Sequence, residues 1–128
     1  YKNRDDSCPF CNLKESDTID SEELAVTVID GYPVTPLHSL IIPKRHIGSY
    51  FELGRPEVNA CNLLLERQKK LIQEKDSEVT GFNIGINDGD TAGQTVMHCH
   101  IHLIPRRKGD MGDPAGGGRG VIPEKQKY

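Results

Sequence analysis

The sequence predicts an α+β domain built around an antiparallel β-sheet. Three observations predict this class. Short β-branched or alternating segments recur along the chain, one amphipathic helix lies between them, and the connections are mostly too short to return a strand parallel to its neighbour. With 128 residues and no internal repeat, the chain has the length of a single domain with one core.

Four segments have the composition of β-strands. Residues 24–30 (LAVTVID) are β-branched and are followed by a Gly and a Pro, and residues 38–43 (HSLIIP) form a short second segment closed by a Pro. These two are expected to pair antiparallel. Residues 81–88 (GFNIGIND) alternate apolar with polar or Gly positions, as in a half-buried strand. The last strand is the histidine-rich segment that ends at Pro105.

Residues 56–75 are predicted to form the one long helix, which begins where a Pro is tolerated in the first turn. Its apolar residues recur at spacings of three and four: Val58, Cys61, Leu64, Leu65, Leu71 and Ile72. Residues 1–20 are polar apart from a CPFC turn, and residues 109–128 are rich in Gly with little periodicity. The domain is therefore expected to span residues 1–108, followed by a tail that is mobile unless it docks.

Charge and hydropathy exclude two classes of protein. The 19 acidic and 16 basic side chains give a net charge of −3, whereas binding to a nucleic-acid backbone depends on a cationic surface. No run approaches the roughly 18 apolar residues of a membrane span. We therefore expect a cytoplasmic protein that binds neither duplex nucleic acid nor a membrane, although the sequence opens on Tyr1 and a leader could have been removed.

The four cysteines are expected to be reduced, because nothing else in the sequence indicates secretion. Cys61 falls on the apolar face of the predicted helix, and Cys99 falls on the packed face of the last strand, so both are interpreted as core residues. Cys8 and Cys11 have the C-x-x-C spacing that serves metal binding in some proteins and redox chemistry in others.

Three of the five histidines fall at alternate positions, namely His98, His100 and His102. In a strand they share one face at about 6.6 Å spacing, which is too far for neighbouring rings to act on one atom. Each of the three rings is therefore expected to have a separate role. A single strand histidine is more often a solvent-facing residue or a buried hydrogen-bond partner. Three on one face, together with His38 and His46, indicate a site that works near neutral pH.

The stretch HCHIHLI fits the pattern His-x-His-x-His followed by two apolar residues, which resembles the signature of the histidine triad superfamily. The stretches YPVTPLHSLIIPKRHIGSYFEL and NDGDTAGQTV, and the whole block 24–107, resemble it in order and spacing. The resemblance implies an antiparallel sheet of about five strands with one long helix and a short one, continued across a homodimer. It also implies chemistry on nucleotides joined through their α-phosphate.

By the same resemblance, His100 attacks the α-phosphorus and carries the nucleotide covalently. Neutral imidazole suits this role because it is nucleophilic at pH 7 and leaves readily once protonated. His102 would contact the nonbridging phosphate oxygens, and Gln94 would reach the bridging or leaving-side oxygen, with an ordinary surface amide as the alternative. His38 resembles the histidine that orients a triad imidazole, with a capped turn histidine as the alternative.

The remaining nucleotide contacts also come from the resemblance. Asp30 and Asn87 match positions near the ribose and phosphate pocket of relatives, and a carboxylate such as Asp30 accepts hydrogen bonds from ribose hydroxyls. The backbone N–H groups of Thr95 and Val96 would add donors to the phosphate. No organic cofactor is expected.

A structural zinc ion is expected on the same basis. Zinc-bearing members of the superfamily use a cysteine pair, the histidine of the PKRH stretch and the first triad histidine, which here are Cys8, Cys11, His46 and His98. Such a site would tie residues 1–20 to the catalytic strand. The alternative is plain thiols, with His98 orienting its neighbours as in zinc-free members.

The basic PRRKGD stretch after the triad resembles the fragile histidine triad branch. This implies a homodimeric hydrolase of dinucleoside polyphosphates, such as diadenosine tri- or tetraphosphate, that releases a nucleoside monophosphate. Arg106, Arg107 or Arg119 could meet an outer phosphate, although a charged linker is the simpler interpretation of each. A phosphoramidate hydrolase and a nucleotide-binding regulator with little turnover are the alternative functions. A nucleotidyltransferase is a further alternative, but the single domain is short for one.

Overall fold

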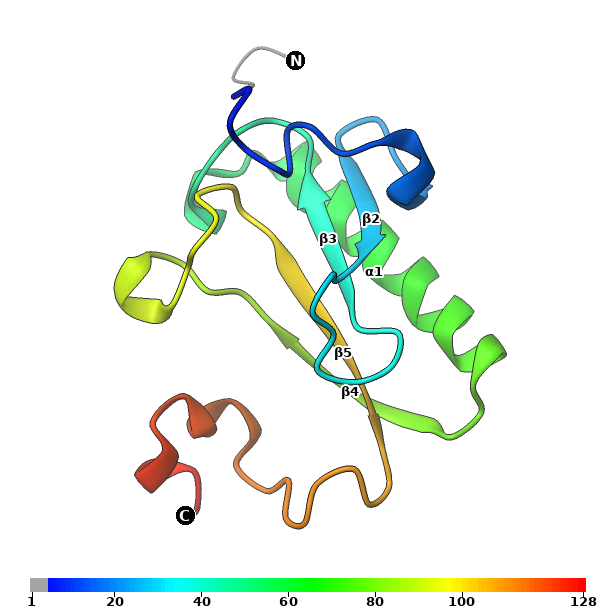
Figure 1. Cartoon of the computed structure of the whole chain (residues 1–128), viewed down its shortest axis with the longest axis vertical. Coiled ribbons are helices and arrows are strands. Elements are labelled where there is room, and N and C mark those ends of the chain that lie inside the picture. The colour runs from blue at the N-terminus through cyan, green and yellow to red at the C-terminus, as the bar shows by residue number, and fades with distance from the viewer. Residues whose placement is uncertain (1–4) are drawn as a thin grey trace.

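The computed structural model describes residues 5–128, so the first four residues of the predicted N-terminal segment lie outside the description. Within it, five antiparallel strands form a sheet in the order β1-β2-β3-β5-β4, and one α-helix packs across a face of that sheet (Figure 1). This confirms the α+β prediction. The elements are β1 (Thr18–Ser21), β2 (Ala25–Ile29), β3 (Ser39–Pro43), α1 (Arg55–Lys75), β4 (Val79–Gly85) and β5 (Ile101–Arg107).

Helix α1 begins one residue before the predicted start and ends at Lys75, as predicted. Pro56 lies in the first turn, where its missing N–H breaks no intrahelical hydrogen bond. The Glu57 carboxylate accepts a hydrogen bond from the backbone N–H of Gly54 at 2.9 Å and so caps the N-terminus. The side chains that α1 buries against the sheet include Cys61, Leu64 and Ile72. None of the helices in residues 5–128 is long and apolar enough to cross a membrane.

The sheet has two differently covered faces. On β5, Ile101 and Leu103 join the core under α1. Because strand side chains alternate, His102, Ile104 and Arg106 lie on the opposite face, which we call the open face. The triad therefore lies on the side of the sheet away from the helix.

Part of the open face is covered by the N-terminal segment. There Phe10 and Leu13 pack against a second apolar cluster formed by Val28, Leu40 and Ile42 of β2 and β3. The C-x-x-C turn is thereby held next to the histidine-rich segment, which Figure 1 shows running beneath it.

Three features differ from the expectations. Strand β1 pairs with β2, but its four residues (TIDS) alternate between half-buried and exposed and are mostly polar, so no hydrophobic pattern indicates it. Strand β5 starts at Ile101, so that His98 and His100 precede it in an irregular segment. In the described part of the chain, 3-10 turns such as Tyr50–Glu52 take the place of the expected short helix.

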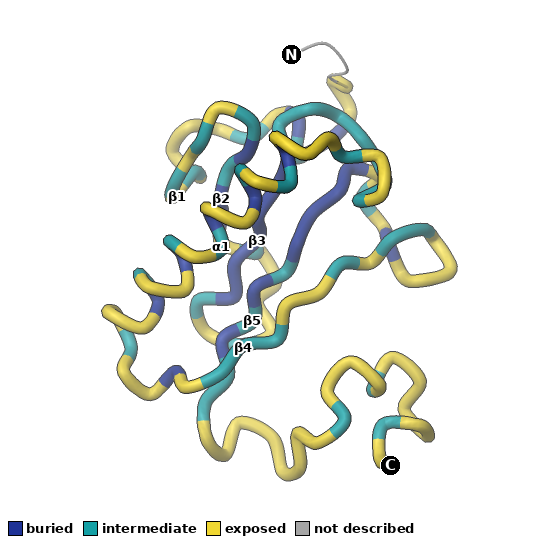
Figure 2. The backbone as a smooth tube through the Cα atoms, turned by 180° about the vertical axis from the view of Figure 1, so that it is seen from behind, coloured by how far each residue is buried: buried dark blue, intermediate teal, exposed yellow. Residues whose placement is uncertain are grey.

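Strand β4 is one edge of the sheet, and it is less buried than its alternating sequence indicates. It ends at Gly85, and the side chain of Ile84 is 61% exposed, although Phe82 packs into the core as predicted. The reason is position, because α1 packs mainly over β2 and β3 and leaves this edge uncovered (Figure 2).

The tail docks back toward β4. Its two 3-10 turns, Gly117–Val121 and Pro123–Lys125, curl up beside the sheet and remain largely exposed (Figures 1 and 2). Gly116 has a φ of 92°, and a Cβ at this position would collide with the backbone carbonyl of Gln126. Only glycine allows this backbone approach, which closes the tail on itself.

Candidate active site

The triad histidines lie where the irregular segment meets β5. His98 is fully buried, His100 is 9% exposed and the side chain of His102 is 22% exposed. The ring centroids of His100 and His102 are 5.2 Å apart, whereas His98 packs edge-on against His46 at 5.1 Å. Each triad ring therefore has its own surroundings and its own hydrogen-bond partners.

The tautomer of His98 is set by the backbone of β3. Its Nε2 lies 2.6 Å from the carbonyl oxygen of Pro43, and because a carbonyl only accepts, Nε2 must carry the proton. The lone pair of the neutral ring is then on Nδ1. That atom lies 3.4 Å from the sulfur of Cys8 and 3.5 Å from the sulfur of Cys11.

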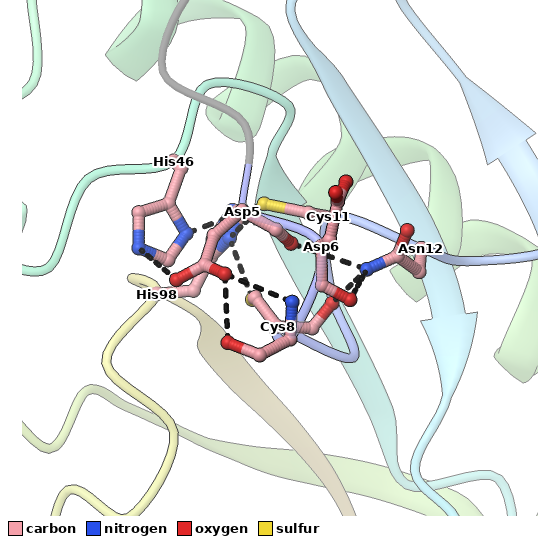
Figure 3. A network of polar contacts seen from close by, with 8 residues as sticks. Asp5, Asp6, Cys8, Cys11, Asn12, His46 and His98 are labelled. Carbon is pink, nitrogen blue, oxygen red and sulfur yellow. Dashed lines mark hydrogen bonds and ion pairs between the residues drawn. The ribbon is translucent and has the colours of Figure 1, made fainter.

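His46 completes the group, with Nδ1 at 3.2 Å from the sulfur of Cys11 (Figure 3). One potential ligand atom from each of Cys8, Cys11, His46 and His98 lies within 4.8 Å of the others. In a tetrahedral zinc site, with Zn–S of about 2.3 Å and Zn–N of about 2.0 Å, sulfur and nitrogen ligands are about 3.5 Å apart. The donor set and its spacing therefore fit a zinc ion. The Asp5 carboxylate lies 3.9 Å from Nε2 of His46, which is beyond hydrogen-bond distance.

His100 is oriented by its own chain. Its Nδ1–H donates to the backbone carbonyl of His98 at 2.8 Å, which leaves the lone pair of the neutral ring on Nε2. Nε2 makes no hydrogen bond to any described residue. The edge of Phe10 packs on this ring at 4.9 Å between centroids. His100 thus offers an unprotonated nitrogen at a partly dry site, as a nucleophile requires.

His102 is oriented by His38. The backbone N–H of Val34 donates to Nδ1 of the buried His38 at 3.0 Å, so the proton of that neutral ring is on Nε2. Nε2–H in turn donates to Nδ1 of His102 at 2.9 Å. This leaves His102 with its own proton on Nε2, as a donor for an anionic ligand. A chain of hydrogen bonds therefore runs from the backbone through two rings to the open face.

Burial favours the neutral form of both rings in this chain. It lowers the pKa of His38 below the ordinary value of 6.5, against the opposing effect of the Asp30 carboxylate. The pKa of His102 is also lowered, mainly by burial and further by the neighbouring rings of His100 and His38. The chain of hydrogen bonds requires both imidazoles to be neutral, because Nδ1 of each ring accepts a hydrogen bond.

Asp30 lies beside both rings, with Oδ2 at 3.4 Å from Nε2 of His38 and 3.8 Å from Nδ1 of His102. Its other oxygen accepts the backbone N–H of Tyr32 at 2.8 Å. These three side chains also have potential ligand atoms within 4.8 Å. The 2.9 Å between the two ring nitrogens is shorter than the about 3.3 Å expected for two nitrogens on one tetrahedral zinc ion. A shared proton fits this spacing better than a metal.

The other predicted site residues are arranged as follows. Gln94 is buried, and its amide accepts from the Gly89 N–H and donates to the carbonyls of Gly48 and Val96 at 2.8–3.1 Å. All of these partners are backbone groups, so the side chain fixes the loop ahead of the triad. Asn87 and Thr95 are exposed and Val96 is half-buried.

The two remaining cysteines are core residues, as predicted. Cys61 and Cys99 are both 1% exposed. Burial raises the pKa of Cys61 to about 11 and that of Cys99 to about 12, so neither is a thiolate at neutral pH. The described cysteines carry no disulfide bonds.

Two contributors to the site were not identified in the sequence. Phe10 packs on His100, and Val34 sets the tautomer of His38 through its backbone N–H. The only signal for Phe10 was an aromatic residue inside the cysteine pair, and a backbone donor leaves no signal in a sequence.

A model of the HIT domain matches residues 13–109. The chain belongs to the HIT family. Among its relatives, an uncharacterized HIT-like protein of Mycoplasma genitalium is 34% identical over 109 residues, which cover 82% of this chain and 77% of that protein. A bis(5′-adenosyl)-triphosphatase of Dictyostelium discoideum is 35% identical over 98 residues, which cover 77% of this chain and 65% of the enzyme. This HIT protein therefore spans slightly less than two thirds of that named hydrolase.

Solved HIT structures share the fold. A zinc-bound histidine triad family protein from Mycobacterium smegmatis superposes with a TM-score of 0.72 at 35% identity, covering 81% of this chain and 78% of that one. The diadenosine triphosphate hydrolase of Plasmodium falciparum, in complex with cyclomarin A, gives a TM-score of 0.74 at 28% identity, covering 88% and 78% respectively. The prediction of a histidine triad fold is confirmed.

Proposed function

We propose that this protein hydrolyses dinucleoside polyphosphates at an α-phosphate, with His100 as the nucleophile. The observation that supports this best is the tautomer of His100. A backbone carbonyl accepts its Nδ1–H at 2.8 Å, and its unprotonated Nε2 has no bond to a described residue. An imidazole held in this state at neutral pH is ready to attack phosphorus without prior loss of a proton.

The reaction would proceed in two displacements. Nε2 of His100 donates its lone pair to the α-phosphorus, a P–N bond forms, and the P–O bond to the leaving nucleotide breaks with its electron pair on oxygen. Water then attacks the same phosphorus, the P–N bond breaks with its electron pair on Nε2, and a nucleoside monophosphate leaves while water gives up a proton to solvent. The ring is then neutral again. Until then, the Nδ1–H bond to the carbonyl of His98 stabilises the positive charge that the nucleotidylated ring carries.

His102 and His38 would act on the phosphate and on each other. Nε2–H of His102 is free to donate to a nonbridging oxygen, where charge develops in the transition state. His38 is a positioning residue, because it keeps the proton of His102 on the side that faces the ligand. Asp30 has the chemistry to accept ribose hydroxyls. The exposed Asn87 and the backbone N–H groups of Thr95 and Val96 remain proposed phosphate and ribose contacts, and Gln94 supports them through the loop.

We also propose a structural zinc ion held by Cys8, Cys11, His46 and His98. When bound, the ion supplies a rigid cross-link and no reactive group, because the four protein ligands fill its tetrahedron. Its effect on catalysis would be indirect. Fixing the ring of His98 also fixes the carbonyl that orients His100.

A homodimer is proposed through the edge of β4. This edge is free of a neighbouring strand within residues 5–128, and it presents the exposed side chain of Ile84. Unpaired strand edges with apolar side chains are disposed to pair with another chain. A second copy pairing here would continue the sheet.

The names of the relatives support cleavage between a nucleoside phosphate and its leaving group. One relative is a bis(5′-nucleosyl)-tetraphosphatase of Schizosaccharomyces pombe, 35% identical over 91 residues that cover 71% of this chain and 50% of that enzyme. Another is an adenylylsulfatase of Arabidopsis thaliana, 31% identical over 108 residues that cover 80% and 54%. Because the second relative is named for a different adenylyl linkage, hydrolysis of other adenylyl linkages, including phosphoramidates, is the alternative function.

The test is to trap the covalent intermediate. Purified protein is mixed with diadenosine triphosphate, quenched within milliseconds and measured by intact-protein mass spectrometry, and the modified peptide is mapped. We expect an adenylyl adduct on the peptide that contains His100 and none in a His100→Asn variant, whose turnover should fall by about 10⁴-fold. An unchanged rate in that variant would exclude the mechanism. An adduct with an adenosine phosphoramidate but none with diadenosine triphosphate would select the alternative substrate.

A further inference from the structure

A cavity of about 680 Å³ lies between the open face of the sheet and the tail. Its floor comes from β4 and β5, through Asn83, Gly85, Ile104 and Arg106. Its outer wall comes from the tail, and one side is closed by Val34 and Thr35 in the loop between β2 and β3. The size falls in the range of about 300–1,000 Å³ that small-molecule sites occupy.

The cavity begins next to the triad. Gly85, in the cavity floor, is the cross-strand partner of His102. The floor is therefore one strand away from the side chain that is proposed to donate a hydrogen bond to the phosphate. Ile104 follows His102 on the same face at about 6.6 Å along β5. Val34, which lines the cavity, also donates to His38. A ligand that reacts at His100 and extends along β5 therefore enters this cavity.

Part of the cavity floor is the guanidinium group of Arg106, which three hydrogen bonds hold in place. Nε and Nη2 of Arg106 donate to the two oxygens of Asp110 at 2.9 and 2.8 Å, and Nη1 donates to Asn83 at 2.7 Å. The N–H groups of a guanidinium lie in its plane, so these bonds hold the plane in place and use none of its two flat faces. Nucleobases stack on such faces. The same bonds occupy Arg106 with a carboxylate and make it a poor partner for an outer phosphate, which was one expectation from the sequence.

The rest of the lining suits a neutral, partly apolar group. Ile104, Met111 and Val121 supply apolar surface around the cavity, and the side chain of Gln126 supplies hydrogen-bonding atoms. The charge of Asp110 is compensated by Arg106, which holds the pKa of that carboxyl well below its usual range. A nucleoside, with an uncharged base and ribose, matches this combination better than a phosphate or a peptide does.

We propose that this cavity binds the nucleoside of the leaving group, so that a dinucleoside substrate spans from His100 to the tail. The inference rests on the proposed function and deepens it, since a mononucleoside substrate lacks the group that the cavity would hold. The HIT match ends at residue 109, whereas Met111, Val121 and Gln126 of the cavity wall lie beyond it. The tail would thus add a specificity element to the HIT domain.

The catalytic test compares two adjacent tail residues. Val121 lines the cavity and Ile122 does not, although both side chains are exposed (80% and 51%), so V121D and I122D compare the same added charge inside and outside the cavity lining. For each variant, kcat/KM is measured with diadenosine triphosphate and with the p-nitrophenyl ester of adenosine 5′-phosphate, which has no second nucleoside. V121D should lower kcat/KM for diadenosine triphosphate about tenfold more than for the ester, and I122D should leave both unchanged. Equal losses on both substrates, or none, would overturn the inference.

A binding test separates failure of this inference from failure of the proposed function. Adenosine alone is titrated into the methyl-labelled wild-type protein and into V121D, and methyl NMR shifts are followed. Shifts at Ile104 and Met111 that are lost in V121D support the cavity even if neither substrate is cleaved. Shifts confined to residues around Asp30, or no shifts, reject the cavity even if diadenosine triphosphate is cleaved.

Discussion

Two groups of histidines flank His100, and they differ in what their partners allow. In the first, His46 and His98 lie beside two sulfur atoms at 3.2–3.5 Å, spacings that match ligands around one metal ion. In the second, His38 and His102 lie beside a carboxylate, with their nitrogens 2.9 Å apart, which matches a shared proton. The same side chain is placed to bind a metal ion in one group and to share a proton in the other.

The comparison teaches that backbone groups assign these roles. A carbonyl acceptor puts the proton of His98 on Nε2 and turns Nδ1 toward the sulfurs. At His38 a backbone N–H donates to Nδ1, which also leaves the ring proton on Nε2, but there the proton points toward His102. Neither outcome depends on an acidic side chain, which is why the composition of the triad alone could not assign them.

The largest expected effect is on the sulfur-containing group. Cys8→Ser should lower bound zinc from about one ion per chain to a small fraction and reduce the free energy of unfolding by about 3 kcal/mol or more, because a metal cross-link is lost. Metal content by mass spectrometry and urea unfolding measure these changes. Cys61→Ala, which removes a core thiol outside the group, should keep the metal content. Equal metal in the Cys8 variant and the wild type would exclude the assignment.

The next effect is on the group with the shared proton. His38→Ala should lower kcat by about 10- to 100-fold with a smaller change in KM, as loss of an orienting partner does. Zinc content should stay unchanged, which separates the two groups. Nitrogen-15 NMR of the His102 ring reports the cause directly, because its proton should no longer be confined to Nε2. An unchanged tautomer with full activity would contradict the proposed chain of hydrogen bonds.

The pH dependence of stability should also report on the pair His38 and His102. The pKa values of His38 and His102 are below 6.5 in the fold, whereas both are ordinary in the unfolded chain, so acid favours unfolding. Stability should be full above pH 6.5 and should fall as the pH drops from there to the folded pKa values, by up to about 1.4 kcal/mol per pH unit for each ring. Asp30 and His100 are the titratable groups that face these two rings. Urea unfolding between pH 7.5 and 5.5 should show a shallower slope in His38→Gln; an identical slope would contradict the prediction.

The smallest effect on activity is expected from substitution of Asp30, which lies beside the rings of His38 and His102 and is also proposed to bind the ribose. Asp30→Asn should raise KM for diadenosine triphosphate by about tenfold, because one charge-assisted acceptor is lost, with kcat nearly retained. A fall in kcat as large as that in His38→Ala would instead place Asp30 with the proton-sharing rings. Steady-state kinetics of the two variants side by side make the distinction.

Most of the fold could be predicted because its elements carry periodic apolar patterns. Residues 56–75 and the β-branched segments 24–30 and 38–43 correspond closely to α1, β2 and β3. Strand β1 has no such pattern, since it is a short polar edge stabilised by pairing with β2 and by Arg67, which bonds Asp20 at 2.6 and 2.8 Å. The closure of the tail on itself depends on the close approach of Gly116 to the backbone of Gln126, and the sequence has no pattern that predicts this contact.

The sequence predicted which residues form the candidate site better than it predicted how they are arranged. The predicted zinc ligands lie together, as do the predicted His38 and His102. The strand that was expected to carry all three triad residues carries only His102, because the chain ahead of Ile101 leaves the sheet to reach the cysteine turn. The cytoplasmic location and the homodimer remain predictions from the sequence.

The hydrogen bond from His100 to the carbonyl of His98 has a consequence for the evolution of this reactivity. In enzymes where a carboxylate orients the reacting imidazole, one codon change deletes the acceptor. Here the acceptor belongs to the peptide bond itself, which every amino acid retains. Substitutions at other positions can therefore disturb the orientation of the proposed nucleophile only by displacing the main chain, so loss of the proposed reactivity and loss of local structure should arise together.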